Sequence, residues 1–143
     1  MLVSLILKQK PLGVVTALPS ISVAELAVLL SEKKIGAVVL STDGKTLEGI
    51  VSERDVVRVL GQKRANALNS PVSTIMTTKV ITCTPQDTAP QVLQMMTDGR
   101  FRHMPVVADG VLVGLISIGD VVKARLSELS MEKDALEGMI KGF

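Results

Sequence analysis

Several residue types that carry common chemistries are scarce in this chain of 143 residues, which has one cysteine, one histidine, two phenylalanines and no tryptophan or tyrosine. A single cysteine, Cys83, excludes an internal disulfide and a cage of thiolate metal ligands. A single histidine, His103, excludes a multi-histidine metal site and weakens a Ser-His catalytic hypothesis. The lack of aromatic rings disfavours base stacking. Aliphatic side chains and methionine must therefore build the core.

Charge and hydropathy exclude further classes. The net charge is +2 with both signs mixed, so no nucleic-acid partner is expected. No apolar run reaches the roughly 18 to 20 residues of a spanning helix, so no membrane partner is expected. The apolar stretch 2–7 has neither basic residues before it nor a cleavage pattern after it, unlike a signal peptide. We expect a cytoplasmic α/β protein.

The chain contains an internal repeat. The segment Gly49–Arg58, GIVSERDVVR, matches Gly114–Lys123, GLISIGDVVK. Upstream, VVTALP at 14–19 matches VITCTP at 80–85, and VSLIL at 3–7 resembles VSTIM at 72–76. These matches predict repeats over residues 3–61 and 72–126, a polar linker at 62–71 and a helical extension at 127–143.

Both repeats predict the same elements. A short β-rich run is expected at 14–16 and at 80–82, each before a proline. Ser22–Glu25 and Thr88–Gln91 each form a capping-box pattern before a helical apolar stripe. Asp43-Gly44 and Asp109-Gly110 lie between apolar runs, at 37–40 and 47–51 and at 104–107 and 111–116, which predicts two hairpins. A second helix starts at Ser52 and at Ser117.

The predicted fold class is α/β (α+β), with two β-α-β-β-α units and a C-terminal helix. A unit of about 55 residues hardly buries a sufficient core alone. We therefore expect the two units to pack as one pseudo-twofold module with two related clefts between them.

The two copies of the pattern Gly, two apolar residues, Ser, two variable residues, Asp and two apolar residues resemble the signature of a tandem CBS-domain pair, also called a Bateman module. The stretch Arg102–Val107 also resembles the second-strand pattern of that family. The resemblance implies a non-catalytic regulatory module that binds adenosine nucleotides (AMP, ADP or ATP, with NAD or S-adenosylmethionine as further candidates). Such a module requires no cofactor.

The resemblance also implies ligand-binding residues. The aspartates would hold ribose hydroxyls, the serines would lie near ribose or phosphate, and the threonines before the first helices and the second-strand backbones would line the adenine pockets. A basic residue at the position of His103 often faces phosphate, and Arg54 is our preferred cation for balancing phosphate charge. The candidate residues are Thr16, Ala37, Val38, Ser52, Arg54, Asp55, Thr82, His103, Met104, Ser117 and Asp120.

Structural explanations compete with these roles. A Ser followed three residues later by an Asp is also a helix-capping pattern. Cys83 is interpreted as a small buried hydrophobe rather than a redox sensor. An adaptor with vestigial clefts is the alternative function. An enzyme is disfavoured because the chain has no nucleophile elbow and no glycine-rich phosphate loop.

Two further expectations concern asymmetry and assembly. We expect unequal clefts and favour tighter phosphate binding in the cleft with Asp120, because its own repeat carries Arg102 and His103 where the first has Gly36 and Ala37. Apolar residues at 122, 126, 129, 136 and 140 follow four-three spacing apart from Lys133. The tail therefore covers its own module or joins a homodimer, which is the assembly that we predict. The sequence does not name the regulated partner protein.

Overall fold

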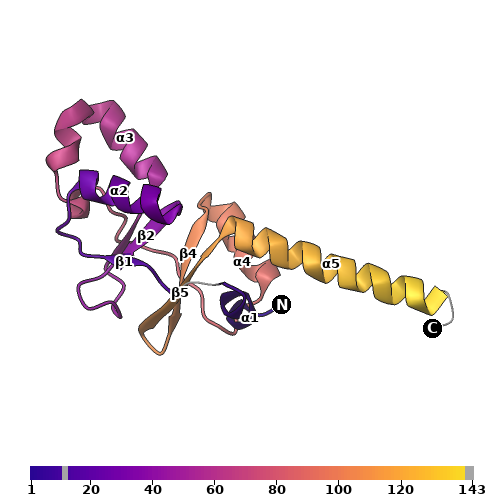
Figure 1. The fold of residues 1–143 in the computed structure, drawn as a ribbon. Helices are drawn as coiled ribbons and strands as arrows, with labels where there is room; N and C mark the ends of the chain where they lie inside the picture. The colour runs from indigo at the N-terminus through magenta and orange to yellow at the C-terminus, as the bar shows by residue number, and fades with distance from the viewer. Residues whose placement is uncertain (11–12, 141–143) are drawn as a thin grey trace.

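The computed structural model describes residues 1–10 and 13–140. The first half contains α1 (Val3–Lys8), β1 (Thr16–Ala17), α2 (Val23–Lys33), β2 (Ala37–Leu40), β3 (Gly49–Ser52) and α3 (Glu53–Lys63). Two 3₁₀ helices, η1 (Arg64–Asn69) and η2 (Val72–Thr74), connect the halves. The second half contains α4 (Ala89–Gly99), β4 (His103–Ala108), β5 (Val111–Ser117) and α5 (Ile118–Ile140) (Figure 1). The predicted mixed fold of two repeats and a C-terminal helix is confirmed.

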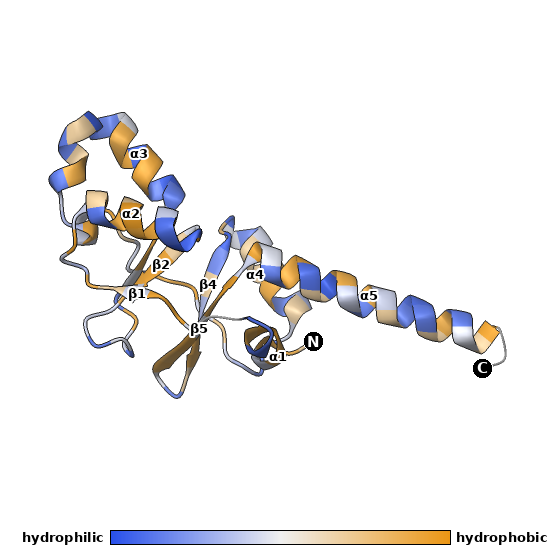
Figure 2. Cartoon of the chain, viewed as in Figure 1, coloured by the Kyte–Doolittle hydropathy of each residue, from blue (hydrophilic) through white to orange (hydrophobic). Residues whose placement is uncertain are grey.

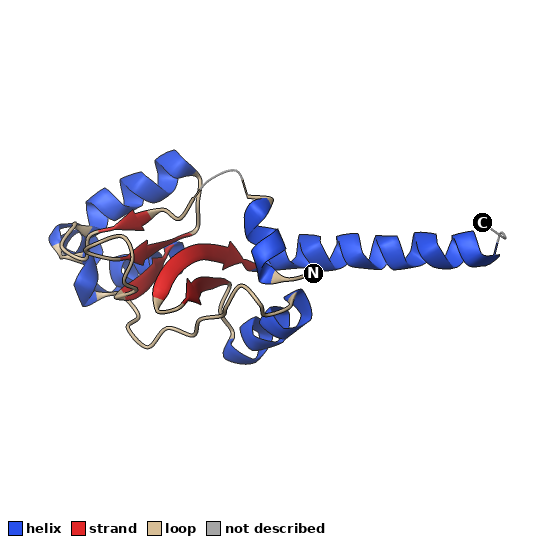
Figure 3. Cartoon of the chain, turned by 90° about the horizontal axis from the view of Figure 1, so that it is seen from below, coloured by secondary structure: helices blue, strands red, loops and turns tan. Residues whose placement is uncertain are grey.

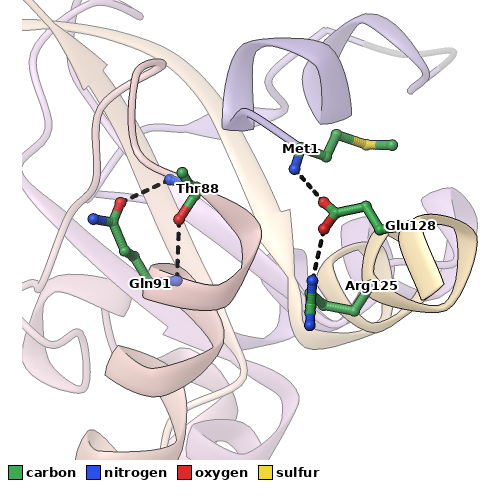
Figure 4. A network of polar contacts seen from close by, with 5 residues as sticks. All are labelled: Met1, Thr88, Gln91, Arg125 and Glu128. Carbon is green, nitrogen blue, oxygen red and sulfur yellow. Dashed lines mark hydrogen bonds and ion pairs between the residues drawn. The ribbon is translucent and has the colours of Figure 1, made fainter. Parts of the chain in front are cut away.

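Capping explains where the first helix of each repeat begins. The Thr88 hydroxyl accepts from Gln91 N–H at 3.4 Å, and the Gln91 side chain accepts from Thr88 N–H at 2.9 Å (Figure 4). The Ser22 hydroxyl accepts from Glu25 N–H at 3.1 Å, which is one of the two bonds of the predicted box. These bonds satisfy N–H groups that a helix start otherwise leaves unpaired.

The two sheets differ at their first strand. β1 pairs in parallel with β2, and β2 pairs antiparallel with β3. In the second repeat β4 and β5 pair antiparallel, but the strand predicted at 80–82 is wrong, because only a single parallel bridge joins Cys83 to Val106. The carbonyl of Pro105 accepts from Cys83 N–H at 3.1 Å, so the nitrogen of Pro105 faces the same side. Proline has no N–H to extend the ladder there.

The two hairpins close differently. Asp109 and Gly110 have φ values of 50° and 78° and form a two-residue turn between Ala108 and Val111, as an Asp-Gly hairpin requires. In the first repeat, the chain from Ser41 to Glu48 is a longer loop, in which the Asp43 carboxylate accepts from the N–H groups of Lys45 and Thr46. β3 therefore begins at Gly49, two residues later than predicted.

The front segment of each repeat, at 3–7 and at 72–76, packs on the core of the other repeat. α1 packs on the second repeat, where Val3 N–H donates to Asp87 O at 2.8 Å and Ser4 N–H to Pro85 O at 3.0 Å. η2 packs on the first, where Val72 N–H donates to Ile21 O at 2.8 Å and Ser73 N–H to Pro19 O at 3.0 Å. The four bonds form two matched pairs under the pseudo-twofold relation. Each core thus contains a segment from the neighbouring repeat.

This exchange explains the glycine that begins each repeated signature. A Cβ on Gly49 would lie 2.6 Å from Met76 Sδ, and one on Gly114 would lie 2.5 Å from Leu7 Cδ2. Leu7 and Met76 are the last residues of the two equivalent front segments, 3–7 and 72–76. The glycines therefore leave room for a side chain that arrives from the other repeat.

The two apolar cores lie one in each half. Fully buried members include Leu26, Val38 and Val51 in the first half and Met96, Met104 and Ile116 in the second. Colouring by hydropathy shows the strands as mainly apolar and α5 as mixed along its length (Figure 2). Cys83 lies in the second core, and burial together with the charge of Asp87 raises the pKa of its thiol to about 12. This environment fits the interpretation of Cys83 as a packing residue.

The segments that follow each repeat are helical. The segment predicted as a polar linker contains η1, whose Ala67 is completely buried in the first core. The predicted extension at 127 is continuous with the last repeat helix, because α5 runs unbroken from Ile118 to Ile140 and projects beyond the body (Figures 1 and 3). The Met1 amino group pairs with the Glu128 carboxylate, which also accepts from Arg125 at 2.6 Å (Figure 4).

Candidate functional site

Two clefts of about 510 and 490 Å³ lie where the repeats meet, and each combines residues of both repeats. We call them the Asp120 cleft and the Asp55 cleft. The Asp120 cleft takes Ser117 and Asp120 from the second repeat; its lining also includes Leu7, Lys10, Gly13, Val14, Val15, Lys34, Ile35, Gly36, Ala37, His103, Val113, Gly114 and Leu115. The Asp55 cleft takes Ser52 and Asp55 from the first repeat; its lining also includes Gly36, Ala37, Ile50, Glu53, Arg54, Arg58, Thr77, Lys79, Val80, Ile81, Gly99, Arg100, Phe101, Arg102 and His103.

In the Asp120 cleft, the aspartate is held at the start of α5. Its Oδ2 accepts from Ser117 N–H at 2.9 Å and from Lys10 Nζ at 2.9 Å, while Asp120 N–H donates to the Ser117 hydroxyl at 3.1 Å. Partial burial acts to raise the pKa of the Asp120 carboxyl, but the Ser117 N–H and the Lys10 ammonium outweigh it and leave the pKa lowered. The group is therefore a fixed, ionised acceptor.

In the Asp55 cleft, the equivalent carboxylate caps α3. Asp55 Oδ2 accepts from Ser52 N–H at 2.8 Å and from the Ser52 hydroxyl at 3.2 Å. Asp55 Oδ1 accepts from Arg58 Nη2 at 2.6 Å. The capping explanation is therefore correct for both Ser-Asp pairs. Capping leaves the carboxylates in the clefts, where the same oxygens are positioned to accept from a ligand hydroxyl.

The two clefts share a wall made of Gly36, Ala37 and His103. The Nε2 of His103 would lie 3.2 Å from a Cβ on Gly36, so glycine allows the ring to lie against the backbone there. Burial lowers the pKa of His103, and the nearby Lys10 and Arg102 also lower it, whereas the carboxylates of Glu53 and Asp120 raise it. A phosphate in either cleft would therefore favour protonation of this ring.

The basic residues are distributed between the clefts against our expectation. Arg102, which we assigned to the Asp120 cleft, lines the Asp55 cleft, together with Arg54, Arg58, Lys79 and Arg100. The Asp120 cleft has Lys10 and Lys34. Arg102 therefore does not support tighter phosphate binding in the Asp120 cleft, because each cleft joins the Ser-Asp pair of one repeat to the second strand of the other.

Four candidate residues lie outside both linings. The side chains of Val38 and Met104 are fully buried in the cores, so only their backbone is left to face a ligand. Thr16 and Thr82 are partly buried; Thr16 pairs with Val39 of β2, and Thr82 precedes Cys83, which bridges to Val106 of β4. Within the described chain, none of the four lines either cleft. The other candidates, Ala37, Ser52, Arg54, Asp55, His103, Ser117 and Asp120, do line one or both.

The candidate residues omit four basic cleft residues that the repeat itself could have revealed. Lys10 and Lys79 each lie seven residues after the start of a VS front segment. Lys34 and Arg100 each follow the first helix of a repeat, in the left-handed region with φ values of 54° and 57°. This conformation turns the chain from helix to strand and leaves a cation beside the cleft.

Other kinds of site find no support in the described residues. Across residues 1–10 and 13–140, no three His, Cys, Asp or Glu side chains are arranged to hold a metal ion. In the same residues, no helix combines the length and the apolar character needed to span a bilayer.

Comparison with known proteins identifies the fold. A CBS-domain protein of Agrobacterium tumefaciens has 45% sequence identity and a TM-score of 0.83, and covers 87% of this chain and 99% of its own. A CBS domain protein of Pyrobaculum aerophilum, complexed with AMP, has 29% identity and a TM-score of 0.79 over 92% of this chain and 99% of its own. The CBS domain pair of protein MJ0100, in complex with 5′-methylthioadenosine and S-adenosyl-L-methionine, has 28% identity and a TM-score of 0.78 over 90% of this chain and 98% of its own.

Sequence comparison agrees. The CBS domain-containing protein CBSX3, mitochondrial, of Arabidopsis thaliana is 37% identical over 117 residues, which are 79% of this chain and 57% of that relative. The chain thus spans just over half the length of this relative. The family model of the CBS domain matches residues 10–62 and 72–127. With two matched domains, two exchanged front segments and a Ser-Asp pair in each cleft, this chain belongs to the CBS domain family, as a tandem pair.

Proposed function

We propose that this chain is a non-catalytic regulatory module that binds an adenosine nucleotide in the clefts between its two CBS repeats. One observation carries the proposal: each cleft presents an aspartate side chain, held by its own serine, against the second strand of the other repeat. A carboxylate fixed in this way is suited to accept two ribose hydroxyl hydrogen bonds. Similar CBS pairs in complex with AMP, or with 5′-methylthioadenosine and S-adenosylmethionine, support an adenosine ligand.

The proposed roles follow the cleft linings. Asp55 and Asp120 hold ribose, and Ser52 and Ser117 lie near ribose or phosphate. The backbones at Ala37-Val38 and His103-Met104 line the adenine pockets, and Thr16 and Thr82, which lie outside both cleft linings, remain candidates from the resemblance alone. Arg54 and His103 balance phosphate charge. ADP, ATP, AMP, NAD and S-adenosylmethionine are the ligands to compare.

Nucleotide binding would change either the assembly of this chain into a homodimer or its contact with a regulated partner protein. We propose a homodimer that α5 helps to form, because this helix projects from the body with Leu126, Leu129 and Leu136 exposed. Ligand state would then be passed to the dimer geometry or to a regulated protein. The cytoplasm remains our proposed compartment, although one relative is named as mitochondrial, and fractionation of cells would test it.

Calorimetric titration tests the ligand. We expect the parent protein to bind at least one of these nucleotides, with Asp55→Ala and Asp120→Ala each losing about ten- to hundredfold in affinity at their own cleft. Circular dichroism and thermal melting would verify that the variants fold, since each change also removes a helix cap. Absence of binding by every nucleotide would instead support an adaptor with vestigial clefts.

A further inference from the structure

The two clefts carry different charge although their architecture is matched. Five cationic side chains line the Asp55 cleft, namely Arg54, Arg58, Lys79, Arg100 and Arg102, against the carboxylates of Glu53 and Asp55. Two cationic side chains, Lys10 and Lys34, line the Asp120 cleft against the carboxylate of Asp120. His103 faces both. The excess of positive charge therefore lies on the side of Asp55.

Ion pairing widens this difference. In the Asp55 cleft only Arg58 is engaged by a described carboxylate, that of Asp55, which leaves Arg54, Lys79, Arg100 and Arg102. In the Asp120 cleft the ammonium of Lys10 is bound both to Asp120 at 2.9 Å and to the carbonyl of Leu115 at 2.7 Å. Lys34 is the one lining cation there that no described carboxylate pairs. The wall of the Asp120 cleft is otherwise rich in aliphatic side chains, including Val14, Ile35 and Leu115.

We infer that the clefts divide ligands by charge: the Asp55 cleft binds an adenosine ligand with two or more phosphate groups, and the Asp120 cleft binds one with a single phosphate or none. The inference rests on the proposed function and adds a ligand class for each cleft. A chain of phosphate groups binds best to several cations that are not already in ion pairs, because no existing ion pair then has to be broken. An uncharged adenosine ligand loses nothing by entering a cleft whose cation is already paired, and gains from the aliphatic wall.

Lys34 and Arg100 provide a matched pair of variants. They occupy equivalent places after α2 and α4, with the same left-handed backbone, but Lys34 lines the Asp120 cleft and Arg100 the Asp55 cleft. Glutamine at either position keeps a long polar side chain and removes the charge. Any cost of the backbone conformation is therefore common to both variants.

The experiment titrates ATP and adenosine separately into the parent, Lys34→Gln and Arg100→Gln proteins. Calorimetry gives the affinity, and the amide NMR signals of Ser52 and Asp55, or of Ser117 and Asp120, report which cleft is filled. We expect ATP to shift the Ser52 and Asp55 signals first and adenosine those of Ser117 and Asp120. Arg100→Gln should weaken ATP binding about three- to tenfold, and Lys34→Gln less than about twofold.

The contrary outcomes are distinguishable. ATP that shifts Ser117 and Asp120 first, or loses the same affinity in both variants, would overturn the division of ligands while leaving nucleotide binding intact. Failure of ATP and adenosine to bind the parent protein would also overturn the division of ligands, and failure of AMP, ADP, NAD and S-adenosylmethionine as well would overturn the proposed function itself.

Discussion

His103 is the residue whose protonation should change both the stability of the fold and the charge of the wall that the two clefts share. It is the only histidine in the chain, so no other imidazole titrates with it. The groups that face it are Glu53, Lys10, Asp120 and Arg102. Burial lowers its pKa below 6.5 in the folded protein, so the unfolded chain binds a proton more readily.

The sign of the pH effect follows. As pH falls from about 7 through 6.5 and then through the folded pKa, the unfolded chain gains a proton first and stability is lost. Urea unfolding at a series of pH values should show this loss, and His103→Gln should flatten the slope. A saturating anionic nucleotide should oppose the loss, because phosphate favours the protonated ring. An identical slope in the parent and the variant would contradict the prediction.

Gly49 is a residue at which one methyl group should be costly. A Cβ there would lie 2.6 Å from Met76 Sδ and 3.0 Å from the Thr77 carbonyl oxygen, which is backbone and cannot simply rotate away. We expect Gly49→Ala to lower the free energy of unfolding by about 1–3 kcal/mol. Gly61→Ala, on α3 with nothing within 4 Å, is the control and should be neutral or stabilise by up to about 1 kcal/mol. Equal stabilities in denaturant titration would refute the close approach.

At the scale of elements, α1 packs on the second core, so a substitution that weakens the packing of α1 should destabilise the second repeat. Val3 is completely buried in the second core, whereas Leu5 on the same helix is 44% exposed. Val3→Ala should cost about 1.5–3 kcal/mol and speed hydrogen exchange in α4 and β4, with little change in α2. Leu5→Ala should change little. Faster exchange confined to α2 would show that α1 belongs to the first repeat.

Local chemistry made much of the fold predictable. The helix caps at Ser22 and Thr88, the turn at Asp109-Gly110 and the paired signatures all depend on residues close in sequence, and they place the helices and hairpins. The absence of a strand at 80–82 was not predictable in this way, although Pro105 is present in the sequence. Its effect becomes clear only when the neighbour of β4 is known.

The exchange of front segments and the composition of the clefts were not predictable from pattern alone. VSLIL at 3–7 and VSTIM at 72–76 are almost equally apolar, so hydropathy does not say which core receives which segment. The same ambiguity misplaced Arg102. Assigning it to a cleft requires knowing that the strand of one repeat faces the Ser-Asp pair of the other.

At the scale of the whole molecule, α5 is the element that the body leaves least covered. Its buried residues, Val121 and Ala124, lie near its beginning, whereas Leu126, Leu129, Leu136 and Ile140 are 48–85% exposed. The helix extends away from both cores (Figures 1 and 3). A projecting helix with this many exposed aliphatic side chains is typical of an interaction surface.

A second copy of the chain is the occupant that we predict for this helix, and point variants test it better than truncation. Removing residues after Leu126 should reduce dimerisation or solubility, but it also removes Glu128, which holds the Met1 amino group and Arg125. Leu129→Gln combined with Leu136→Gln keeps that contact and removes only exposed apolar side chains, so sedimentation should shift toward monomer. Lys133→Gln, between them on α5 and 75% exposed, is the control and should leave the distribution unchanged. A double variant that sediments as the parent dimer, or a parent that is monomeric at every concentration, would show that α5 does not join two copies.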